Sequence, residues 1–483
     1  MRWILFAAAF VASISTAGAQ VTVSRTFPGQ SGPDSSENAA FSADMMGGVS
    51  PKYLVGFLNR GISIRSKADG KELQPPQTLL EFWTAALKNA GAELVGQPYD
   101  PRIFFDPLSS RWFATCNSRA DAKIRGSMTA HMLIGVSSDD DPRHPWKAVE
   151  FDAKVSVDNM KLGLDRNGFY ATALASPKVP VIAIPKTDLL WKGRAVPSLA
   201  HLNYMDVDVI RLDDKKGSGQ EGMVPAFDLN PNKTRGDAMV FVNRYRTEVG
   251  GETFIQIRKL TWTSATTATL SEAVNVGLGT HHPVQPTTRA VQPPLPGGLY
   301  SPAIGPGEGR VVNAVARHGS VWTIAATEVG DRVGAFWVEI DLATMKTAQH
   351  GTLRLPDADI LFPSLNVDAR GNLGIAFTRT SATEGPSTYV TGRLKADPPN
   401  TIRPAVRASE GRFVYLRPET DLTKPDQGTS YSDYSTTVMD PSDPMLFWSY
   451  QQVASHDCLP KEANGGRFGT NWVAFRVGGS GKK

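Results

Sequence analysis

Short runs of β-branched and aromatic residues recur along the chain, and each run is bounded by Gly, Pro, Asp, Asn or Ser. This pattern is typical of β-strands that are separated by tight turns. It predicts strands at 53–64, 111–116, 131–136, 168–174, 179–184, 239–243, 253–259, 311–316, 321–326, 336–340, 373–379, 445–450 and 471–477. One stretch, 79–90, instead has the spacing of a short helix that ends before Gly91.

The predicted strands gather into clusters that repeat about every 40 to 60 residues. This is the period of propeller blades, in which each four-stranded sheet buries its faces against its neighbours. An array of β-sandwiches would also give many strands. Such an array would need clear linkers between its domains, and the sequence shows none. We therefore predict an all-β fold, a single propeller of seven four-stranded blades, with units that begin near residues 40, 99, 158, 222, 301, 360 and 428.

The first residues have the pattern of a secretory signal peptide. Arg2 gives a positive start, 3–12 form a short apolar stretch, and 17–19 (AGA) are the small residues of a cleavage site. An apolar run of about ten residues is too short to span a bilayer, although a buried N-terminal strand is an alternative. The predicted organisation is a signal peptide at 1–19, an N-terminal extension at 20–39, the propeller at 40–478 and a flexible tail at 479–483. We expect a secreted or periplasmic protein with no membrane span.

Composition adds little about partners but excludes one class. The chain has 44 Gly and 34 Pro, as a turn-rich fold requires, and its net charge is only +4. Nucleic-acid binding needs a concentrated basic footprint, and this charge gives no sign of one. We therefore expect no nucleic-acid partner, and we expect a monomer.

The chain has two cysteines, Cys116 and Cys458. An even count in an oxidising compartment favours a disulfide. Cys116 ends a predicted strand and Cys458 lies in a loop near the C-terminus, and a closed ring could make these distant segments neighbours. We expect a Cys116–Cys458 disulfide. The alternative is two free thiols, with Cys116 buried as a small apolar side chain.

Several segments in order resemble a family of secreted bacterial propeller proteins that are loosely described as sialidase-like. The segments are 44–53 (DMMGGVSPKY) with Asn59 and 67–70; 100–102 with Asp106 and 111–112; 313–322 and 336–341; 362–364 with Asp368 and 371–372; and 432–435 with 440–441 and 447–448. In the last motif, Tyr431 and Ser432 stand where the family has Trp-Gly. The resemblance implies a seven-bladed propeller, and it implies no single activity, because the family has none assigned.

The sequence contains no common enzyme signature. We find no H-E-x-x-H, no P-loop, no dinucleotide fingerprint and no G-x-S-x-G elbow. The S-x-D-x-G-x-T-W turn typical of sialidase blades is also missing, and 368–372 (DARGN) is interpreted as a tight turn whose Asp bonds backbone amides. The run 139–141 (DDD) is interpreted as a solvated loop, with a Ca²⁺ site as the alternative. No other cofactor is predicted.

One positional argument identifies candidate site residues. In a propeller, the loops that lead into the innermost strands surround one mouth of the central channel, where converging polar groups tend to bind ligands. The candidates at these positions are Asp100, Arg102, Asp158, Asn159, Lys161, Ser301, Ser364, Asp433 and Tyr434. The alternative is that Asp100 and Asp433 cap strand starts and tie adjacent blades together.

From these observations we predict a non-catalytic binding module for a glycan or an extracellular protein. The alternative function is a sialidase-like glycoside hydrolase at the channel mouth, which would place two carboxylates about 5 to 10 Å apart across an open pocket. A third alternative is a scaffold whose channel is plugged by its own side chains.

Overall fold

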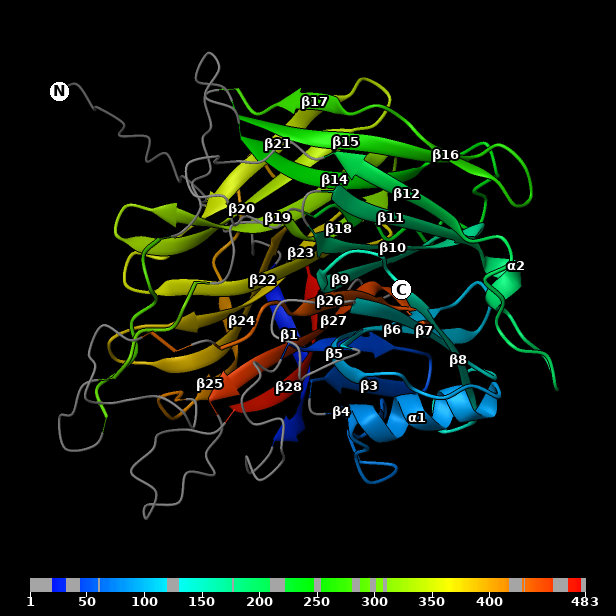
Figure 1. The fold of residues 1–483 in the computed structure, drawn as a ribbon. Helices are drawn as coiled ribbons and strands as arrows, with labels where there is room; N and C mark the ends of the chain where they lie inside the picture. Colours follow the sequence, from blue (N-terminus) through cyan, green and yellow to red (C-terminus); the bar gives the residue numbers. More distant parts are fainter. Residues whose placement is uncertain are drawn as a thin grey trace, which may run out of the picture.

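The computed structural model shows a ring of antiparallel β-sheets (Figure 1). It describes residues 20–31, 44–59, 61–119, 130–175, 178–208, 222–246, 253–279, 287–295, 301–306, 311–416, 428–429, 431–454 and 468–478. Within these residues the chain forms seven sheets, which we number as blades 1 to 7 in chain order. No helix of the described residues is long and apolar enough to cross a membrane.

Each blade contributes one strand to the centre of the ring. These innermost strands are β2 (Met46–Val49), β5 (Gln97–Asp106), β9 (Val157–Leu164), β13 (Val224–Pro225), β18 (Val311–Arg317), β22 (Asp359–Val367) and β26 (Thr436–Asp440). Residues from these strands or adjoining them line one axial cavity of about 30 Å³, which we call the channel. The seven strands therefore surround a common axis, and the prediction of a seven-bladed propeller is confirmed.

The remaining strands extend each blade outward through hairpins. They are β3 (Tyr53–Leu58) and β4 (Gly61–Ser66) in blade 1; β6 (Arg111–Arg119), β7 (Ala130–Ser137) and β8 (Trp146–Asp152) in blade 2; β10 (Gly168–Ala175), β11 (Lys178–Pro185) and β12 (Asn203–Asp208) in blade 3; β14 (Met239–Arg246), β15 (Thr253–Trp262), β16 (Ala268–Leu270) and β17 (Val274–Gly277) in blade 4; β19 (Ser320–Val329), β20 (Arg332–Asp341) and β21 (Lys346–Leu353) in blade 5; β23 (Leu373–Thr380), β24 (Gly385–Arg393) and β25 (Val406–Gly411) in blade 6; and β27 (Asp443–Ala454), β28 (Phe468–Val477) and β1 (Val21–Ser31) in blade 7. Middle strands such as β10 are buried along their whole length, because neighbouring blades cover both faces.

The blades differ from the uniform four strands that the sequence predicts. In the described residues, blade 1 has three strands and blade 4 has five, since β16 and β17 both pair with β15. The predicted strand at 53–64 is a hairpin, β3 and β4. Beyond β4, two isolated bridges, Arg65–Glu72 and Ile62–Gln77, continue blade 1.

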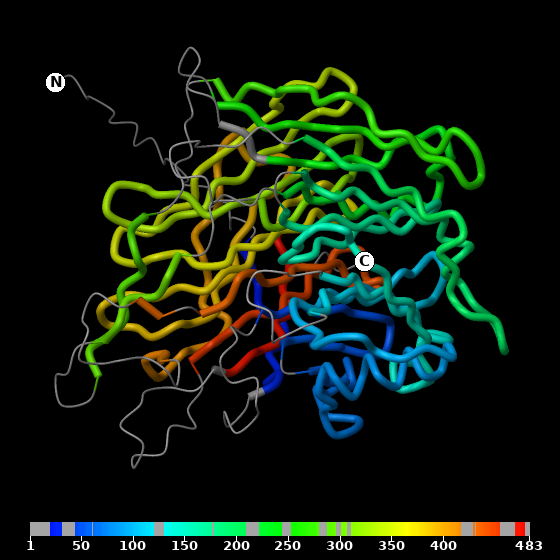
Figure 2. Tube along the Cα trace, viewed as in Figure 1, coloured from blue at the N-terminus to red at the C-terminus, as the bar shows by residue number. Residues whose placement is uncertain are grey.

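Strand β1 closes the ring. It lies within the segment that the sequence analysis set apart as an N-terminal extension, and it pairs antiparallel with β28 from Val21–Val477 to Ser31–Gly469. Figure 2 shows this blue N-terminal strand among the orange and red strands of blade 7. The first and last strands of the described chain thus share one sheet.

Aromatic side chains fill the seam between blade 7 and blade 1. Trp472 is fully buried and stacks on Tyr450, with ring centroids 4.4 Å apart. On the facing strand β2, a Cβ built at Gly47 would lie 2.4 Å from Trp472 Cη2. The seam therefore depends on a glycine at position 47, because any larger residue would overlap the Trp472 ring.

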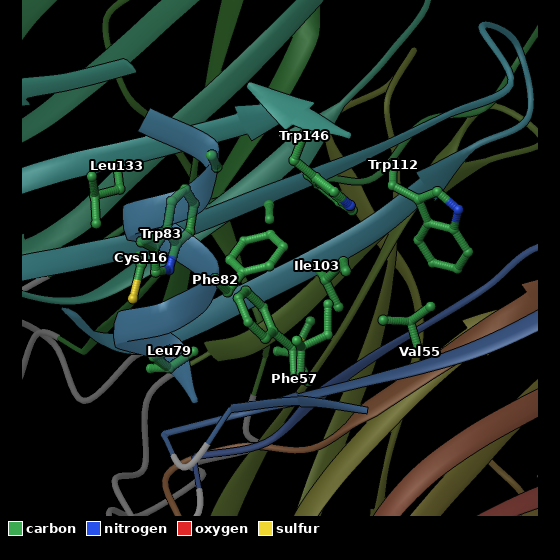
Figure 3. Close-up of a cluster of buried hydrophobic side chains, with 14 of the residues drawn as sticks. Val55, Phe57, Leu79, Phe82, Trp83, Ile103, Trp112, Cys116, Leu133 and Trp146 are labelled. Carbon is green, nitrogen blue, oxygen red and sulfur yellow. The ribbon is translucent and has the colours of Figure 1, made fainter. Parts of the chain in front are cut away.

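Helix α1 (Leu79–Asn89) confirms the one predicted helix. It begins with a capping box, in which Glu81 Oε2 accepts from Thr78 N at 2.8 Å and Thr78 Oγ1 accepts from Glu81 N at 3.2 Å. Its apolar face buries Phe82 and Trp83 against blades 1 and 2 (Figure 3). A second, single-turn helix, α2 (Lys186–Leu189), was not predicted.

Buried ion pairs join adjacent blades in a repeated arrangement. In three blades an aspartate at or just after the end of the innermost strand accepts from the backbone amide two residues ahead and from a lysine of the next blade. The pairs are Lys186–Asp106 at 2.8 Å, Lys233–Asp165 at 3.2 Å and Lys67–Asp440 at 2.9 Å from Nζ to carboxylate oxygen. The last pair crosses the closure seam. Asp368 in blade 6 forms the same backbone turn, as the sequence analysis interpreted it.

Cys116 lies in β6 and is fully buried, and its Sγ donates to Tyr99 O at 2.9 Å. Burial raises the pKa of this thiol. It is a free cysteine within the described residues. Cys458 lies outside the described residues, so the predicted disulfide stays a prediction.

Candidate functional site

Hydrogen bonds tie four consecutive blades together at the upstream mouth of the channel, where the innermost strands begin. Asp433 N donates to Asp44 Oδ1 at 2.9 Å, and Asn59 Nδ2 donates to Asp44 Oδ2 at 2.7 Å. Asp100 N donates to Asn59 Oδ1 at 2.7 Å, and Asn159 N donates to Asp100 Oδ2 at 2.9 Å. These contacts link blades 7, 1, 2 and 3. They match the structural alternative for Asp100 and Asp433, and the ligand-binding role of the candidates stays a prediction.

A β-bulge recurs in the innermost strands and positions the candidate side chains. Asp100, Asn159 and Phe362 have positive φ values of 55°, 45° and 46°, and each sits at a register shift of its strand. The residues two places further on are Arg102, Lys161 and Ser364. The bulge thus sets equivalent positions in blades 2, 3 and 6, which no pattern in the sequence reveals.

Arg102 and Lys161 are buried in the channel wall. Arg102 Nη2 and Lys161 Nζ both donate to Asn159 Oδ1, at 2.7 and 2.6 Å. Arg102 also donates through Nε to Met160 O at 2.8 Å, and its guanidinium lies 3.5 Å above the ring of Tyr434. Burial lowers the pKa of Arg102. These side chains are held by protein groups inside the ring.

The two candidate serines take no part in the hydrogen bonds that join Asp433, Asp44, Asn59, Asp100 and Asn159. Ser364 is fully buried between blades 6 and 7, where its Oγ lies 2.7 Å from Thr437 Oγ1 and 3.0 Å from Ser435 Oγ. Ser301 Oγ donates to Pro293 O, in a segment before β18. Asp433 is exposed and Asp158 is half-buried. Of the nine predicted residues, the structure therefore gathers Asp100, Arg102, Asp158, Asn159, Lys161, Asp433 and Tyr434.

Asp100 carries the strongest electrostatic perturbation at this mouth. Burial, the nearby charges of Asp44 and Asp158, and a hydrogen bond with the Asp158 carboxyl raise the pKa of Asp100 well above its ordinary value. A carboxyl in this environment is favoured in its protonated form. The side chain can then donate to Asp158 while its Oδ2 accepts from Asn159 N.

We expect Asp100→Asn to make the protein more stable than the wild type at neutral pH. Because the folded-state pKa of Asp100 is raised, the stability that its proton provides is complete below about pH 4 and is lost as the pH rises through the folded-state value. Asn keeps a donor and an acceptor without this loss, and it tolerates the positive φ. Urea unfolding between about pH 4 and neutral pH measures the effect. The free energy of unfolding of Asp100→Asn should exceed that of the wild type at neutral pH, and this difference should disappear near pH 4.

Asp100→Ala is the matched control. It removes the acceptor for Asn159 N and leaves a left-handed residue without a polar side chain, so we expect it to be about 1 to 3 kcal/mol less stable than Asp100→Asn at every pH. Neither variant has the titrating carboxyl, so the difference between them should not depend on pH. An Asp100→Asn variant that is less stable than wild type at neutral pH would show that the ionised carboxylate supports the fold.

Two aspartates of the acidic run 139–141 contact basic side chains of their own loop. Asp141 forms an ion pair with Arg143, whose Nε donates to Asp141 Oδ1 at 2.9 Å, and Asp139 contacts His144 Nδ1 at 2.9 Å. The hydrogen bond from Arg143 is the main cause of the lowered pKa of Asp141. No group of three or more metal-ligating side chains occurs in the described part of the chain. A Ca²⁺ site stays a prediction.

A larger cavity lies at the other end of the channel, and the sequence analysis missed it. We call it the downstream pocket. It has a volume of about 660 Å³, and residues at or near the ends of the innermost strands line it. Lining residues from four strands are Val49, Phe105, Ala316, Arg317, Met439 and Asp440. This volume lies within the usual range of small-molecule sites, about 300 to 1,000 Å³.

Two phenylalanines separate the downstream pocket from the channel. Phe104 and Phe227 line both cavities, and their rings are stacked with centroids 4.4 Å apart. Both side chains are half-buried. The channel is therefore nearly filled by side chains, while the downstream pocket combines an apolar wall with a polar rim.

The carboxylates of the downstream pocket already have partners. Asp228 accepts from Lys233 Nζ at 2.8 Å, and Asp440 accepts from Lys67 Nζ at 2.9 Å. Hydrogen bonds from the backbone and side chain of Thr234 lower the pKa of Asp237. These three are the only aspartates or glutamates among the described residues that line the pocket.

Comparison with known proteins identifies no family for this chain. No protein-family model matches it, and no curated protein matches its sequence. Solved structures with a similar chain course include the Dos1 propeller, with 8% identity, 96% coverage of both chains and a TM-score of 0.40.

Two further similar structures are the hemagglutinin-neuraminidase of parainfluenza virus 5 and a Trypanosoma rangeli sialidase. The first has 8% identity, covers 82% of this chain and 92% of the viral chain, and has a TM-score of 0.39. The second has 10% identity and a TM-score of 0.36; the match covers 82% of this chain but spans only 57% of that sialidase chain. These scores are low, so the assignment as a propeller rests on the strand pairing of this chain itself.

Proposed function

We propose that this protein is a non-catalytic binding module whose ligand occupies the downstream pocket. The observation that carries the proposal is the pocket itself, about 660 Å³ with a wall of stacked rings and a rim of polar side chains. Sites for small polar ligands combine these two features, since apolar surface supplies affinity and a few polar groups fix orientation. We propose a glycan as the ligand, and action outside the cytoplasm because of the predicted signal peptide.

The placement of the carboxyl groups supports binding over hydrolysis. Glycoside hydrolysis needs a carboxylic acid of raised pKa and a second carboxylate at least about 5 Å away. In the downstream pocket the pKa of Asp237 is lowered, and Asp228 and Asp440 are paired with lysines. At the upstream mouth a hydrogen bond with the Asp158 carboxyl helps to raise the pKa of Asp100, so these two carboxyls are closer together than the pair that glycoside hydrolysis needs.

The test is retention of intact glycans from a broad panel, with product masses measured in parallel. We expect retention without shortened products. Phe227→Leu keeps an apolar side chain but removes the flat ring face, which is worth about 0.5 to 1.5 kcal/mol in aromatic contacts. We therefore expect retention to weaken up to about tenfold.

Phe254→Leu is the matched control, because Phe254 is also half-buried but lies on β15, outside the pocket. It should leave retention unchanged. Asp433→Ala tests the other mouth. Retention that Asp433→Ala abolishes and Phe227→Leu does not would place the ligand upstream, and shortened glycans would establish hydrolysis in place of binding.

A further inference from the structure

Arg317 is a cation of the downstream pocket that has no hydrogen-bond or ion-pair partner for its side chain among the described residues. It is the last residue of β18, it is half-buried, and it lines the pocket. Within the described ranges, its guanidinium makes no hydrogen bond or ion pair with another side chain or with the backbone. A guanidinium has five N–H donors, and because none of them is used by the described residues, they are open to a ligand in the pocket.

The nearest carboxylates cannot serve as these partners in the present arrangement. Asp228 and Asp368 act on Arg317 through their charges alone. Asp228 already accepts from Asn230 N at 3.0 Å and from Lys233 Nζ at 2.8 Å. Asp368 is fully buried and accepts from the amides of its own turn. Burial lowers the pKa of Arg317, which is the expected result for a charge removed from water without a close partner.

The apolar wall of the pocket is fixed beside Arg317. Phe227 forms a parallel bridge with Val315, and Ala316 N donates to Phe227 O at 3.1 Å. Phe227 N in turn donates to Ala314 O at 2.9 Å. These bonds hold the segment with Phe227 along β18, so the stacked rings and the guanidinium are parts of one rigid wall.

We propose that Arg317 binds an oxyanion, a carboxylate or phosphate group, of a small ligand whose apolar part lies on Phe104 and Phe227. The inference rests on the proposed function and names the chemistry of its ligand. A planar guanidinium pairs bidentately with either oxyanion. In a partly dehydrated pocket such a pair is stronger than on the open surface.

The test uses small probes that differ only in the group offered to Arg317. Benzoate and benzamide share a flat ring and differ in charge, while phenyl phosphate offers the second oxyanion. Calorimetric titration of the full chain should show benzoate or phenyl phosphate binding at least about tenfold more tightly than benzamide, as a charge-assisted bidentate contact requires. The preferred anion identifies the group of the natural ligand.

Arg317→Gln should bring the affinity for the anionic probes down to that of benzamide, and Arg317→Lys should keep part of the difference because it keeps the charge. Arg354→Gln is the matched control, since Arg354 is exposed and lies outside the pocket. It should leave the binding of all probes unchanged. Circular dichroism and the Tm of each variant confirm that the fold is kept.

The outcomes separate the two proposals. Equal binding of benzoate and benzamide, weakened by Phe227→Leu but not by Arg317→Gln, would overturn the oxyanion inference and leave the pocket as the binding site. Benzoate binding that Arg317→Gln and Arg354→Gln change equally would also overturn it. If no probe binds, the oxyanion inference is overturned, while the pocket as a glycan site is decided separately by the retention test with Phe227→Leu.

Discussion

Replacing Lys186 with Met is expected to lower the free energy of unfolding by about 3 to 5 kcal/mol. The change leaves Asp106 without its cation, at a position where both the lysine and aspartate side chains are almost fully buried. A buried carboxylate that loses its partner keeps its desolvation penalty and loses the compensating attraction. Urea unfolding of the two proteins measures the difference directly.

Lys178→Met provides the matched control within the same blade. Lys178 pairs with Asp208 at 3.7 Å, but both side chains are largely exposed. Exposed pairs contribute little, so this variant should change stability by less than about 1 kcal/mol. Equal effects of the two substitutions would mean that the buried pairs between blades do not hold them together.

Replacing Trp472 with Ala is expected to destabilise the protein by about 3 to 5 kcal/mol, the usual range for a fully buried Trp. The side chain stacks on Tyr450 and fills the seam between blade 7 and blade 1. Thermal and urea unfolding of the variant give the value. A loss below about 1 kcal/mol would show that the seam contributes little to the closed ring.

Gly47→Ala turns this prediction into a double-mutant cycle. Alone, the added methyl group would overlap Trp472 and should cost about 1 to 3 kcal/mol. In the Trp472→Ala background the overlap with the indole ring is removed and the close approach to Tyr450 Cβ, at 2.8 Å, remains, so the cost of the methyl group should fall in part. Additive effects would show that residues 47 and 472 do not contact each other across the seam.

Local sequence patterns predicted most of the hairpin strands, but they did not predict how the ring closes. Hairpin strands such as β10 and β19 are runs of β-branched and aromatic residues, which read directly as strands. The innermost strand β13 has only two residues, and β5 contains two prolines, so neither gives a strand pattern. The pairing of β1 with β28 joins segments about 450 residues apart, and no local signal encodes it.

The candidate site was predicted in part for the same reason. Asp100 and Asp433 lie in recognisable motifs, and the structure brings them to one mouth. The downstream pocket joins Phe227 from the chain after β13 with Arg317 from β18 and Asp440 from β26. Arg317 and Asp440 lie in segments that resemble the propeller family, but nothing in those segments indicates that they line one pocket with Phe227. Their shared signal is their position at or just after the downstream ends of innermost strands.

The pairing of β1 with β28 also constrains how the protein is made. During synthesis β1 emerges about 450 residues before its partner strand β28, so the ring cannot be completed until both strands have been made. Until then both edges of the growing array have unpaired backbone groups, which are prone to association with other chains. A chain cut short before β28 lacks the closing partner of β1, however well its other blades are formed. The unfinished chain therefore has exposed sheet edges until β28 is made.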